Sequence, residues 1–377
     1  MNRIRIVLIG GGHAHIEVVR QFQSLFPART AEGASVEMVL VNPEPGAVYS
    51  GMIPGVVGGH YRPEDCLINL PALCDGYGVG WYQGRLQDLN IPEKMVVMAD
   101  GHRLQFDYLS LDIGSVPATG SIQEAYHAVA VKPAHGFLQR WEQYLQHIEV
   151  SRPQSVVVVG GGVAGVELVL AMEHRIRTMI GAAANGWRWH LVSGGEILIG
   201  HNVLVRHRAR RALQLAGVNC MTGVKVERVH HRSLELSDGV QLDSDFTLLC
   251  TSAAPSQSLS ASGLPLSEHG YVRVDDRLQV RAIPEVFAVG DIADFPQPLV
   301  KAGVYAVRQG PVLAHNLAKA IRGEPLQAYT PQKKFLKLIS LGGKKAMASR
   351  GWFFCSGAWV WRWKNSIDSR FMEKYQR

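Results

Sequence analysis

Two copies of one glycine-rich pattern constrain the fold of this chain more than any other feature of its sequence. The first copy, IRIVLIGGGHAHIEVV at residues 4–19, has an apolar strand that runs into three glycines and then a helix. The second copy, SVVVVGGGVAGVEL at residues 155–168, repeats this order. Such loops let backbone N–H groups and the positive end of the helix hold a pyrophosphate. The sequence therefore predicts an α/β protein with two Rossmann-like dinucleotide-binding domains.

The first copy departs from the pattern at its third glycine. That glycine normally lets the helix and the strand pack closely, and the second copy has Gly165 there, whereas the first has His15. Two interpretations are open. Either His15 is a packed spacer beneath a slightly displaced helix, or His13 or His15 contacts the phosphates of the bound cofactor.

The strands that follow the two loops carry no acid at their ends. An acid at this position usually binds ribose hydroxyls. Asn42 occupies the position in the first copy, where an amide can still bond a hydroxyl, and Ser193 occupies it in the second, with Glu196 three residues later. The basic residues that follow leave room for the 2′-phosphate of NADP, or they form a solvated helix face. They are Arg206, Arg208, Arg210 and Arg211.

The composition is that of an ordinary globular protein. The chain has 377 residues, of which 47% are hydrophobic and 19% charged, which leaves room for two or three domains. Its five cysteines lack zinc spacing, so we expect neither a metal site nor a disulfide framework. The N-terminus lacks the regions of a signal peptide, and no run approaches the ~18 apolar residues of a membrane-spanning helix. We therefore expect a cytoplasmic protein.

A third motif, PEVFAVGDIAD at residues 284–294, is the most specific one. It resembles the late flavin motif of the two-dinucleotide-binding-domain flavoproteins, the pyridine nucleotide-disulfide oxidoreductase superfamily, where the matching aspartate, here Asp291, bonds the ribityl chain of FAD. In that family the NAD(P) domain is inserted in the FAD domain. The resemblance implies an FAD-binding domain at 1–115 and 275–330, an NAD(P)-binding domain at 116–274, and a small C-terminal hairpin-helix region at 331–377.

The segments DYLSLDIGS (107–115) and LLCTSAAPS (248–256) resemble the two connections between these domains. Both depart from the usual Ala-Thr-Gly triplet. Asp112, Ile113 and Gly114 replace it in the first segment, and Cys250, Thr251 and Ser252 replace it in the second.

Three further segments narrow the resemblance: YSGMIPGVVGGHY (49–61), VKPAHGF (131–137) and KAGVYAVRQGPVLAHNL (301–317). They are similar to the module often fused to selenide, water dikinase, and more distantly to type II NADH dehydrogenases and sulfide:quinone reductases. The resemblance covers nearly the whole chain and implies FAD and NAD(P)H as cofactors.

No CxxxxC pair stands beside the expected flavin, where this chain has YSGMIPGVVGG. Cys66 and Cys74 are too far apart in sequence for that motif, and they are interpreted as ordinary thiols, as are Cys250 and Cys355. The alternatives are a redox pair of Cys66 with Cys74 and a sulfide-oxidising pair of Cys250 with Cys355. We therefore expect hydride to pass from NAD(P)H to FAD, and electrons to leave directly for a quinone or similar small acceptor.

Two residues are catalytic candidates. Lys301, at the start of the expected helix KAGVYAVRQG, would stabilise negative charge on the reduced flavin, unless it is a solvated lysine. Glu167 resembles a glutamate near the nicotinamide in type II NADH dehydrogenases, unless it is a first-turn acid favoured by the helix dipole. The residues expected to bind FAD are Gly10, Gly12, His13, Ala14, Asn42, Ser50, Gly51, Gly114, Asp291 and Gly303, and those expected to bind NAD(P)H are Gly160, Gly162, Gly165 and Ser193.

The C-terminal tract contains four of the eight tryptophans. FLKLISL and AMASRGWFF, around Gly342 and Gly343, predict a hairpin, and a helix follows. Along that helix a stripe recurs every four residues. It consists of Trp359, Trp363, Ile367, Phe371 and Tyr375. Such a stripe packs against a core or a second subunit of a homodimer. Alternatively, it lies on an anionic membrane surface together with the basic residues Arg362, Lys364, Arg370 and Lys374.

The net charge of +7 and the pI near 9.2 fit peripheral attachment to the cytoplasmic face of a membrane. Nucleic acid is the usual rival partner, but no nucleic-acid fold signature supports it. The leading hypothesis is an FAD-dependent NAD(P)H oxidoreductase, type II NADH dehydrogenase-like, that reduces a quinone. The alternatives are a redox partner or reductase in selenium metabolism and a non-enzymatic nucleotide sensor.

Overall fold

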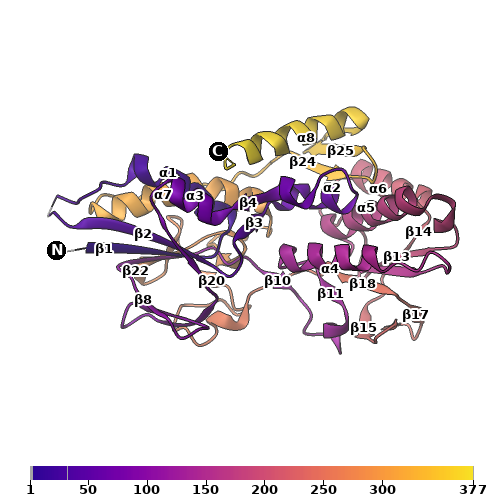
Figure 1. Ribbon diagram of the computed structural model, residues 1–377, viewed down its shortest axis with the longest axis horizontal. Coiled ribbons are helices and arrows are strands. Elements are labelled where there is room, and N and C mark those ends of the chain that lie inside the picture. The colour runs from indigo at the N-terminus through magenta and orange to yellow at the C-terminus, as the bar shows by residue number, and fades with distance from the viewer. Residues whose placement is uncertain (1–2, 32, 377) are drawn as a thin grey trace.

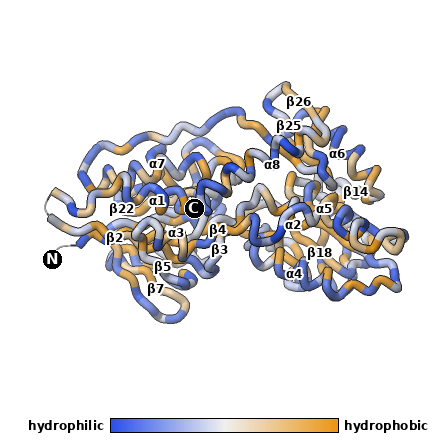
Figure 2. Tube along the Cα trace, turned by 45° about the horizontal axis from the view of Figure 1, so that its top comes forward, coloured by the Kyte–Doolittle hydropathy of each residue, from blue (hydrophilic) through white to orange (hydrophobic). Residues whose placement is uncertain are grey.

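The computed structural model describes residues 3–31 and 33–376. Two sheets lie side by side, each with helices against it, and the C-terminal segment lies across both (Figure 1). Hydrophobic segments of the trace gather in the interior of each half (Figure 2). Within the described residues, no helix is both long and apolar enough to span a bilayer.

The first sheet joins strands from both ends of the chain. In spatial order it contains β21 (Gln279–Val280), β22 (Ile283–Ala288), β9 (Tyr108–Leu111), β1 (Arg3–Ile9), β2 (Ser35–Asn42) and β5 (Gly80–Gln83). β1 pairs in parallel with β2 and β9, so that Ile9 lies opposite both Val41 and Leu111. β22 pairs in parallel with β9, which returns residues 283–288 to the sheet that the N-terminal strands begin.

Helices cover one face of this sheet and a small antiparallel sheet covers the other. α1 (His13–Leu25), α3 (Leu70–Gly76) and α7 (Gly303–Ile321) share one core with Ile6 and Leu8 of β1. Gly310 permits the close approach of α7 to α1, because a Cβ there would lie 2.8 Å from the Cβ of Glu17. The opposite face, with Val7 and Ile9, packs against β6 (Leu86–Asn90), β7 (Met95–Met98) and β8 (Arg103–Gln105).

The second sheet is parallel throughout. Its order is β11 (Val129–Ala130), β18 (Phe246–Leu249), β12 (Ser155–Val159), β13 (Arg188–Ser193) and β14 (Val218–Thr222). All of β12 is buried, which explains its continuous run of valines. α4 (Ala134–Gln146), α5 (Val163–Ile180) and α6 (Val203–Leu215) pack on one face, and β15 (Val226–Val229), β16 (Ser233–Leu236) and β17 (Gln241–Asp243) pack on the other. Two such units confirm the predicted α/β fold.

Two short strands connect the units. β10 (Val116–Pro117) pairs antiparallel with β19 (Ala253–Ala254), so the chain enters and leaves the second unit through adjacent segments. We retain 1–115 with 275–330, 116–274 and 331–377 as proposed domain boundaries. The remaining elements are β3 (Gly46–Val48), β4 (Leu67–Asn69), α2 (Ile53–Val57), β20 (Val272–Arg273), β23 (Ala293–Asp294), and the 3₁₀ turns η1 (Ser50–Met52), η2 (Pro63–Cys66), η3 (Ala125–His127), η4 (Gly181–Ala184), η5 (Gln257–Leu259) and η6 (Gly290–Ile292).

The C-terminal region is a three-stranded sheet followed by a helix. β24 (Lys337–Ser340) and β25 (Ala346–Arg350) form the predicted hairpin around Gly342 and Gly343. The prediction of one strand through AMASRGWFF was wrong, because Gly351, at φ 60°, reverses the chain and β26 (Phe353–Gly357) pairs back onto β25. α8 (Ala358–Glu373) follows.

Candidate active site

The first glycine loop connects β1 to α1 and has no space for side chains. Gly10 has φ 99°, and a Cβ there would lie 2.4 Å from the carbonyl oxygen of Asp112. A Cβ on Gly12 would lie 2.2 Å from the Asp112 carboxylate. α1 begins at His13, with Gly12 as its N-cap and no side chain of Gly12 to cap it. This is the cradle that a pyrophosphate requires, so the loop fits the FAD that the sequence predicts.

His15 takes part in packing. Its side chain is completely buried, with Nδ1 2.7 Å from the Gly10 carbonyl oxygen and Nε2 2.8 Å from Ser110 Oγ. Burial lowers its pKa to about 4, so the imidazole is neutral. With both ring nitrogens engaged, the packed-spacer interpretation applies to His15. His13 packs among other aromatic rings. Its ring centre is 5.7 Å from that of Tyr49 and 5.8 Å from that of Phe371.

The carboxylate of Asp112 also contacts the N-terminus of α1. Its Oδ2 accepts hydrogen bonds from Ala14 N at 3.0 Å and His15 N at 3.3 Å. Burial raises the pKa of this carboxyl to about 7, against the lowering effect of the two N–H groups, and the nearby charge of Asp291 raises it further. Gly114, two residues on, has φ 70° and open space around it.

Asn42 lies at the end of β2, as predicted, but its amide is largely engaged within the protein. Oδ1 accepts a hydrogen bond from Gly11 N at 2.8 Å, and Nδ2 donates one to the Glu44 carbonyl oxygen at 2.7 Å. Asn42 therefore positions the glycine loop, and a ribose contact by its amide stays a prediction.

Asp291 is the centre of a charged cluster. Its Oδ2 accepts hydrogen bonds from Lys132 Nζ at 2.7 Å and Ser115 Oγ at 2.8 Å. Burial raises the pKa of Asp291, but the adjacent Lys132 ammonium outweighs burial and lowers it overall, so the group is an anion. The sequence analysis did not assign a role to Lys132, which lies in the VKPAHGF segment. Its ammonium holds the aspartate of the flavin motif in place.

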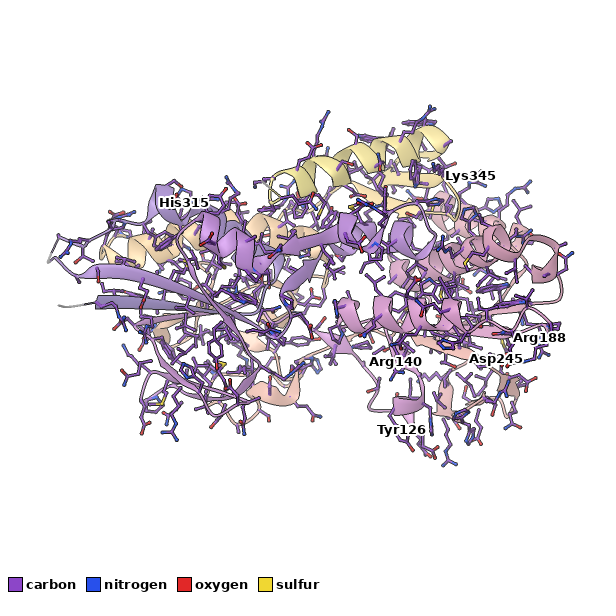
Figure 3. All side chains as sticks on the ribbon, in the orientation of Figure 1. Tyr126, Arg140, Arg188, Asp245, His315 and Lys345 are labelled. Atoms are coloured by element: carbon purple, nitrogen blue, oxygen red, sulfur yellow. The ribbon has the colours of Figure 1, made fainter. Side chains whose placement is uncertain are left out.

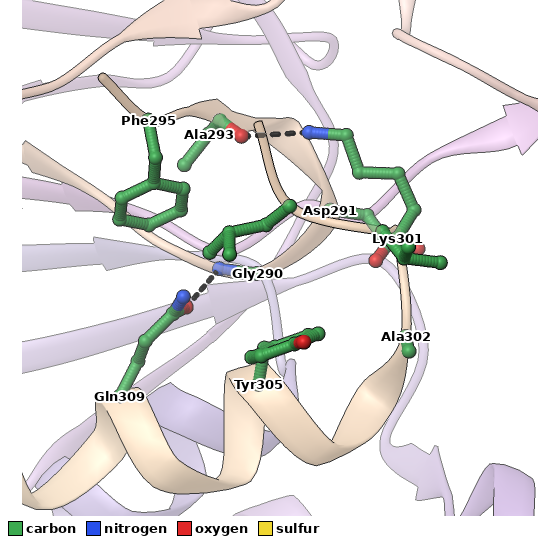
Figure 4. A pocket seen from close by; sticks show the side chains of 10 residues that line it. Gly290, Asp291, Ala293, Phe295, Lys301, Ala302, Tyr305 and Gln309 are labelled. Carbon is green, nitrogen blue, oxygen red and sulfur yellow. Dashed lines mark hydrogen bonds between the residues drawn. The ribbon is translucent and has the colours of Figure 1, made fainter. Parts of the chain in front are cut away.

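Lys301 is not at the helix start that the sequence predicted, because α7 begins two residues later at Gly303. Its ammonium donates a hydrogen bond to the Ala293 carbonyl oxygen at 2.7 Å (Figure 4). It also lies 4.0 Å from the centre of the Tyr271 ring. Lys301 is thus held by protein groups, and its action on a flavin stays a prediction. Gly303 does lie near Ser50, since a Cβ on Gly303 would be 3.5 Å from Ser50 Oγ.

The second glycine loop joins β12 to α5 in the same way. Gly160 has φ 124°, and a Cβ there would lie 2.1 Å from the Cys250 carbonyl oxygen. A Cβ on Gly165 would lie 1.9 Å from the Gly160 carbonyl oxygen, so this glycine allows close helix–strand contact. Gly162 faces open space, and beside the loop the buried Thr251 Oγ1 has no partner among the described residues. Both features fit a bound nucleotide.

Glu167 lies beneath the C-terminal sheet. It is the fifth residue of α5, so its interpretation as a first-turn acid was wrong. Its Oε1 accepts a hydrogen bond from Ser340 N at 2.7 Å. Burial raises its pKa to about 7, although the positive charge of Lys364 lowers it in part.

Side chains of α8 contact the segment that is expected to lie beside the flavin. Lys364 Nζ donates hydrogen bonds to the Gly51 carbonyl oxygen at 2.5 Å and to Asp368 Oδ2 at 2.6 Å. Tyr49 OH donates to Asp368 Oδ1 at 3.2 Å. Glu167, Lys364 and Asp368 form what we call the α8 polar cluster. The expectation that Lys364 is one of the basic residues on a membrane surface was wrong, because its side chain is buried. Asp368 was not singled out, although its four-residue spacing from Lys364 on a helix was a signal that the two share a face.

The cysteines near this region are buried thiols. Cys66 in η2 and Cys74 in α3 belong to the first core, and burial raises their pKa values to about 11 and about 12. Burial also raises the pKa of the Cys250 thiol. A raised pKa disfavours the reactive thiolate, which argues against the redox pairs weighed as alternatives.

Comparisons with known proteins agree with this geometry. The chain is 23% identical over 367 residues to ferroptosis suppressor protein 1 of Mus musculus, which covers 93% of this chain and 90% of that protein. It is 24% identical to an NADH dehydrogenase-like protein of Mycobacterium tuberculosis, over 97% of this chain and 93% of that protein.

Two solved structures share the fold. The sulfide:quinone oxidoreductase of Aquifex aeolicus gives a TM-score of 0.82 at 16% identity, over 99% of this chain and 91% of that chain. NDH2 of Plasmodium falciparum in complex with NADH gives 0.80 at 14% identity, over 100% and 99%. The model of the family described as pyridine nucleotide-disulphide oxidoreductase matches residues 4–316. The chain therefore belongs to the pyridine nucleotide-disulphide oxidoreductase family, as its glycine loops and its Asp291 motif predicted.

Proposed function

We propose that the protein is an FAD-dependent oxidoreductase that takes hydride from NAD(P)H and passes electrons to a quinone, without a redox disulfide. The observation that carries the proposal is the α8 polar cluster. In this cluster Lys364 donates a hydrogen bond to Gly51, in the segment expected beside the flavin. Its charge also acts on Glu167, which lies on the helix of the second glycine loop. This places a buried acid and a cation between the helix of the second glycine loop and the segment expected beside the flavin, and no cysteine stands in the Ser50–Val57 segment.

The residues around the loops bind and orient. FAD supplies the redox chemistry and accepts the hydride. The N–H groups of Gly12 and His13, which have no acceptor among the described residues, would hold its pyrophosphate together with the positive end of α1. Asp291, fixed by Lys132 and Ser115, would hold its ribityl hydroxyls. The second loop, with the open face of Gly162, would hold the pyrophosphate of NAD(P)H.

Glu167 is suited to supply a proton. Reduction of a quinone to a quinol takes the hydride and one further proton. With a pKa near 7, Glu167 is present in both protonation states at neutral pH, which is the condition for general acid catalysis. Lys364 is ion-paired with Asp368, but its positive charge also lowers the pKa of Glu167 in part and so would favour the anion that loss of the proton leaves.

The comparisons support a quinone as acceptor and a nicotinamide nucleotide as hydride donor. One structural neighbour is described as a sulfide:quinone oxidoreductase and another as a complex with NADH. None of the relatives named above is described as acting on selenium compounds, so selenium metabolism is not part of the proposal.

The test is turnover by the FAD-loaded protein with NADH or NADPH and a soluble short-chain quinone. Glu167→Gln should lower kcat by about a hundredfold or more, the order of a lost general acid, and should remove the inflection of its pH profile near neutrality. Glu173→Gln is the matched control, because Glu173 is also buried in α5 but pairs with Arg177. It should keep both kcat and the inflection. Absence of quinone-dependent oxidation by the wild type would reject the proposal.

We further propose that the acceptor side of the protein lies on an anionic membrane. Trp352 is 93% exposed and Trp359 is 50% exposed, and the ring centres of Trp359 and Trp363 are 6.3 Å apart. Asn202, the N-cap of α6, hydrogen-bonds to the Gly351 carbonyl oxygen, which brings α6 beside Trp352. We name this surface the apolar ridge. Its exposed members are Ile199, Val203, Leu204, Trp352, Phe353, Trp359, Trp363 and Ile367.

Basic side chains flank the apolar ridge. They are the exposed Lys344, Lys345, Arg350, Arg362 and Arg370. Tryptophan beside cationic residues suits the headgroup level of an anionic bilayer, where a quinone dissolved in the lipid would reach the flavin. A peripheral position on the cytoplasmic face is therefore proposed.

A further inference from the structure

The structure locates the adenosine ribose position of the second glycine loop at Ser193. This residue ends β13, and a Cβ on Gly161 would lie 2.4 Å from Ser193 Oγ. The first loop shows the same relation, because a Cβ on Gly11 would lie 3.2 Å from Asn42 Cγ. In dinucleotide folds the residue at this strand end decides whether a ribose 2′-hydroxyl or a 2′-phosphate is accepted.

Negative charge is neutralised at this position. Ser193 carries no charge, and its hydroxyl can donate to a phosphate as well as to a hydroxyl. Glu196 forms an ion pair with Arg210 of α6. It lies in a loop that is held beside the glycines, because Leu198 N donates a hydrogen bond to the Gly161 carbonyl oxygen. An acid paired in this way repels a phosphate far less than a free acid at the strand end.

Positive charge is left uncompensated there. Val224 N donates a hydrogen bond to the Ser193 carbonyl oxygen at 3.2 Å, which brings the segment after β14 against the strand end. The stem of Lys225 then lies over Gly194, since a Cβ on Gly194 would be 3.0 Å from Lys225 Cγ. Lys225 is exposed and forms no ion pair with any acid in the described part of the chain.

From this arrangement we infer that the second glycine loop accepts the 2′-phosphate of NADPH, with Lys225 as its counter-charge, Ser193 as a neutral donor, and Arg210 neutralising Glu196. The inference deepens the proposed function and rests on it, because it names the nucleotide that reduces the flavin. The opposite outcome is that Glu196 leaves Arg210 and binds the ribose diol of NADH.

The first experiment needs no turnover. Calorimetry of the FAD-loaded protein compares adenosine 2′,5′-bisphosphate with 5′-AMP, which differ only in the 2′-phosphate. The bisphosphate should bind about tenfold more tightly, the order of one charge-assisted hydrogen bond, and added salt should reduce the difference. Lys225→Ala and Arg210→Ala should each lower this preference several-fold. Arg188→Ala is the control, because Arg188 begins β13 at the end remote from the loop and pairs with Asp243 (Figure 3).

The second experiment measures kcat/KM for NADPH and NADH with the same quinone. The ratio should fall about tenfold in Lys225→Ala and stay constant in Arg188→Ala. The inference would be overturned if the wild type bound adenosine 2′,5′-bisphosphate and 5′-AMP equally tightly. It would also be overturned if Lys225→Ala weakened the binding of both ligands by the same factor. Discrimination in calorimetry without quinone turnover would reject the proposed function and leave the inference standing, so the two failures are distinguishable.

Discussion

His15 shows how one side chain can replace a glycine at a helix–strand contact. In the second loop Gly165 leaves room for the Gly160 carbonyl oxygen, and in the first loop the His15 imidazole fills the matching space and bonds the Gly10 carbonyl oxygen at 2.7 Å. Helix α1 and strand β1 therefore stay in contact through a hydrogen bond, whereas α5 and β12 are in direct van der Waals contact.

His15→Ala should lower the free energy of unfolding by about 2–4 kcal/mol, because it opens a cavity and leaves Ser110 buried without a partner. Urea unfolding of the FAD-loaded protein measures this. The double variant with Ser110→Ala should lose less than the sum of the two single losses. His102→Ala, at an exposed position, should change stability little. Additive losses would show that the His15–Ser110 hydrogen bond contributes nothing.

Asp112 should make FAD retention pH-dependent. Its pKa is raised from 3.8 to about 7, so the folded protein holds this proton more tightly than the unfolded chain does. Its contribution to stability is therefore greatest at acid pH and declines as pH rises toward 7, where the carboxylate forms. That carboxylate occupies N–H groups beside the pyrophosphate, so FAD affinity should fall between about pH 6 and about pH 8.

Asp112→Asn removes the charge and keeps an oxygen acceptor, so its FAD dissociation constant should change much less over the same pH range. Flavin fluorescence on titration with apoprotein measures the constant, and Asp276→Asn, at an exposed position, is the control. A wild-type affinity that is flat or rises with pH would contradict the prediction.

At these positions the sequence predicted the backbone and missed the side-chain partners. Glycine reports a local backbone requirement, so Gly10, Gly12, Gly160 and Gly165 could be placed from spacing. The bond between Asp112 and Ala14 joins residues 98 apart in the chain, and no local pattern encodes such a contact. The same limit hid Lys132 from the Asp291 motif.

At the scale of elements, α8 is the feature that the sequence described only in part. The predicted stripe splits: Tyr375 is buried in the first core and Phe371 stacks on Tyr49 with ring centres 4.2 Å apart, whereas Trp359, Trp363 and Ile367 are exposed. The helix packs through the next stripe instead, which consists of Val360, Lys364, Asp368 and Met372. In a sequence, a lysine and an aspartate four residues apart are typical of a solvated face, so the periodicity of the apolar residues did not show that this stripe is the buried one.

Glu17 anchors the end of α8 to α1. Its Oε2 accepts hydrogen bonds from Lys374 Nζ and Tyr375 OH, both at 2.7 Å. Burial alone would raise the pKa of Glu17, but these bonds and the one from Arg20 lower it to about 2. The resulting stabilisation is present above the ordinary pKa of 4.5 and is lost as pH falls toward 2.

Glu17→Gln should therefore lower stability by about 2 kcal/mol at neutral pH and should speed hydrogen exchange of α8 amides. The effect on stability should shrink in acid. Glu173→Gln, which breaks a pair within α5, should leave exchange in α8 unchanged. Unaltered α8 exchange in Glu17→Gln would mean that the cores alone hold the helix.

At the scale of the whole molecule, the apolar ridge runs from the start of α6 to the middle of α8 and so combines the second unit with the C-terminal region. Sequence analysis found the tryptophans of this surface but not Ile199, Val203 and Leu204, because only the fold brings them beside Trp352.

Vesicles containing an anionic lipid should sediment the wild-type protein, and salt should weaken the binding. Trp359→Ala with Trp363→Ala should weaken it further without lowering the melting temperature, since both side chains are at least 37% exposed. Tyr126→Ala is the control, because this exposed tyrosine lies on the opposite side of the molecule from α8 (Figure 3). A folded wild type that does not sediment would reject the membrane proposal. Dissociation of a dimer by the tryptophan variant would assign the ridge to a subunit interface.

The strand order also decides when each sheet can be completed during synthesis. All strands of the second sheet lie between residues 129 and 249, so they are available together before the chain is finished. The first sheet must wait, because β9 ends at residue 111 and its partner β22 begins at residue 283. Until then β9 is an open edge to which another strand could add. The second sheet can therefore be completed while the rest of the chain is still being synthesised. The first sheet, with the expected flavin site, is completed last, when β22 and α8 pack against the N-terminal elements.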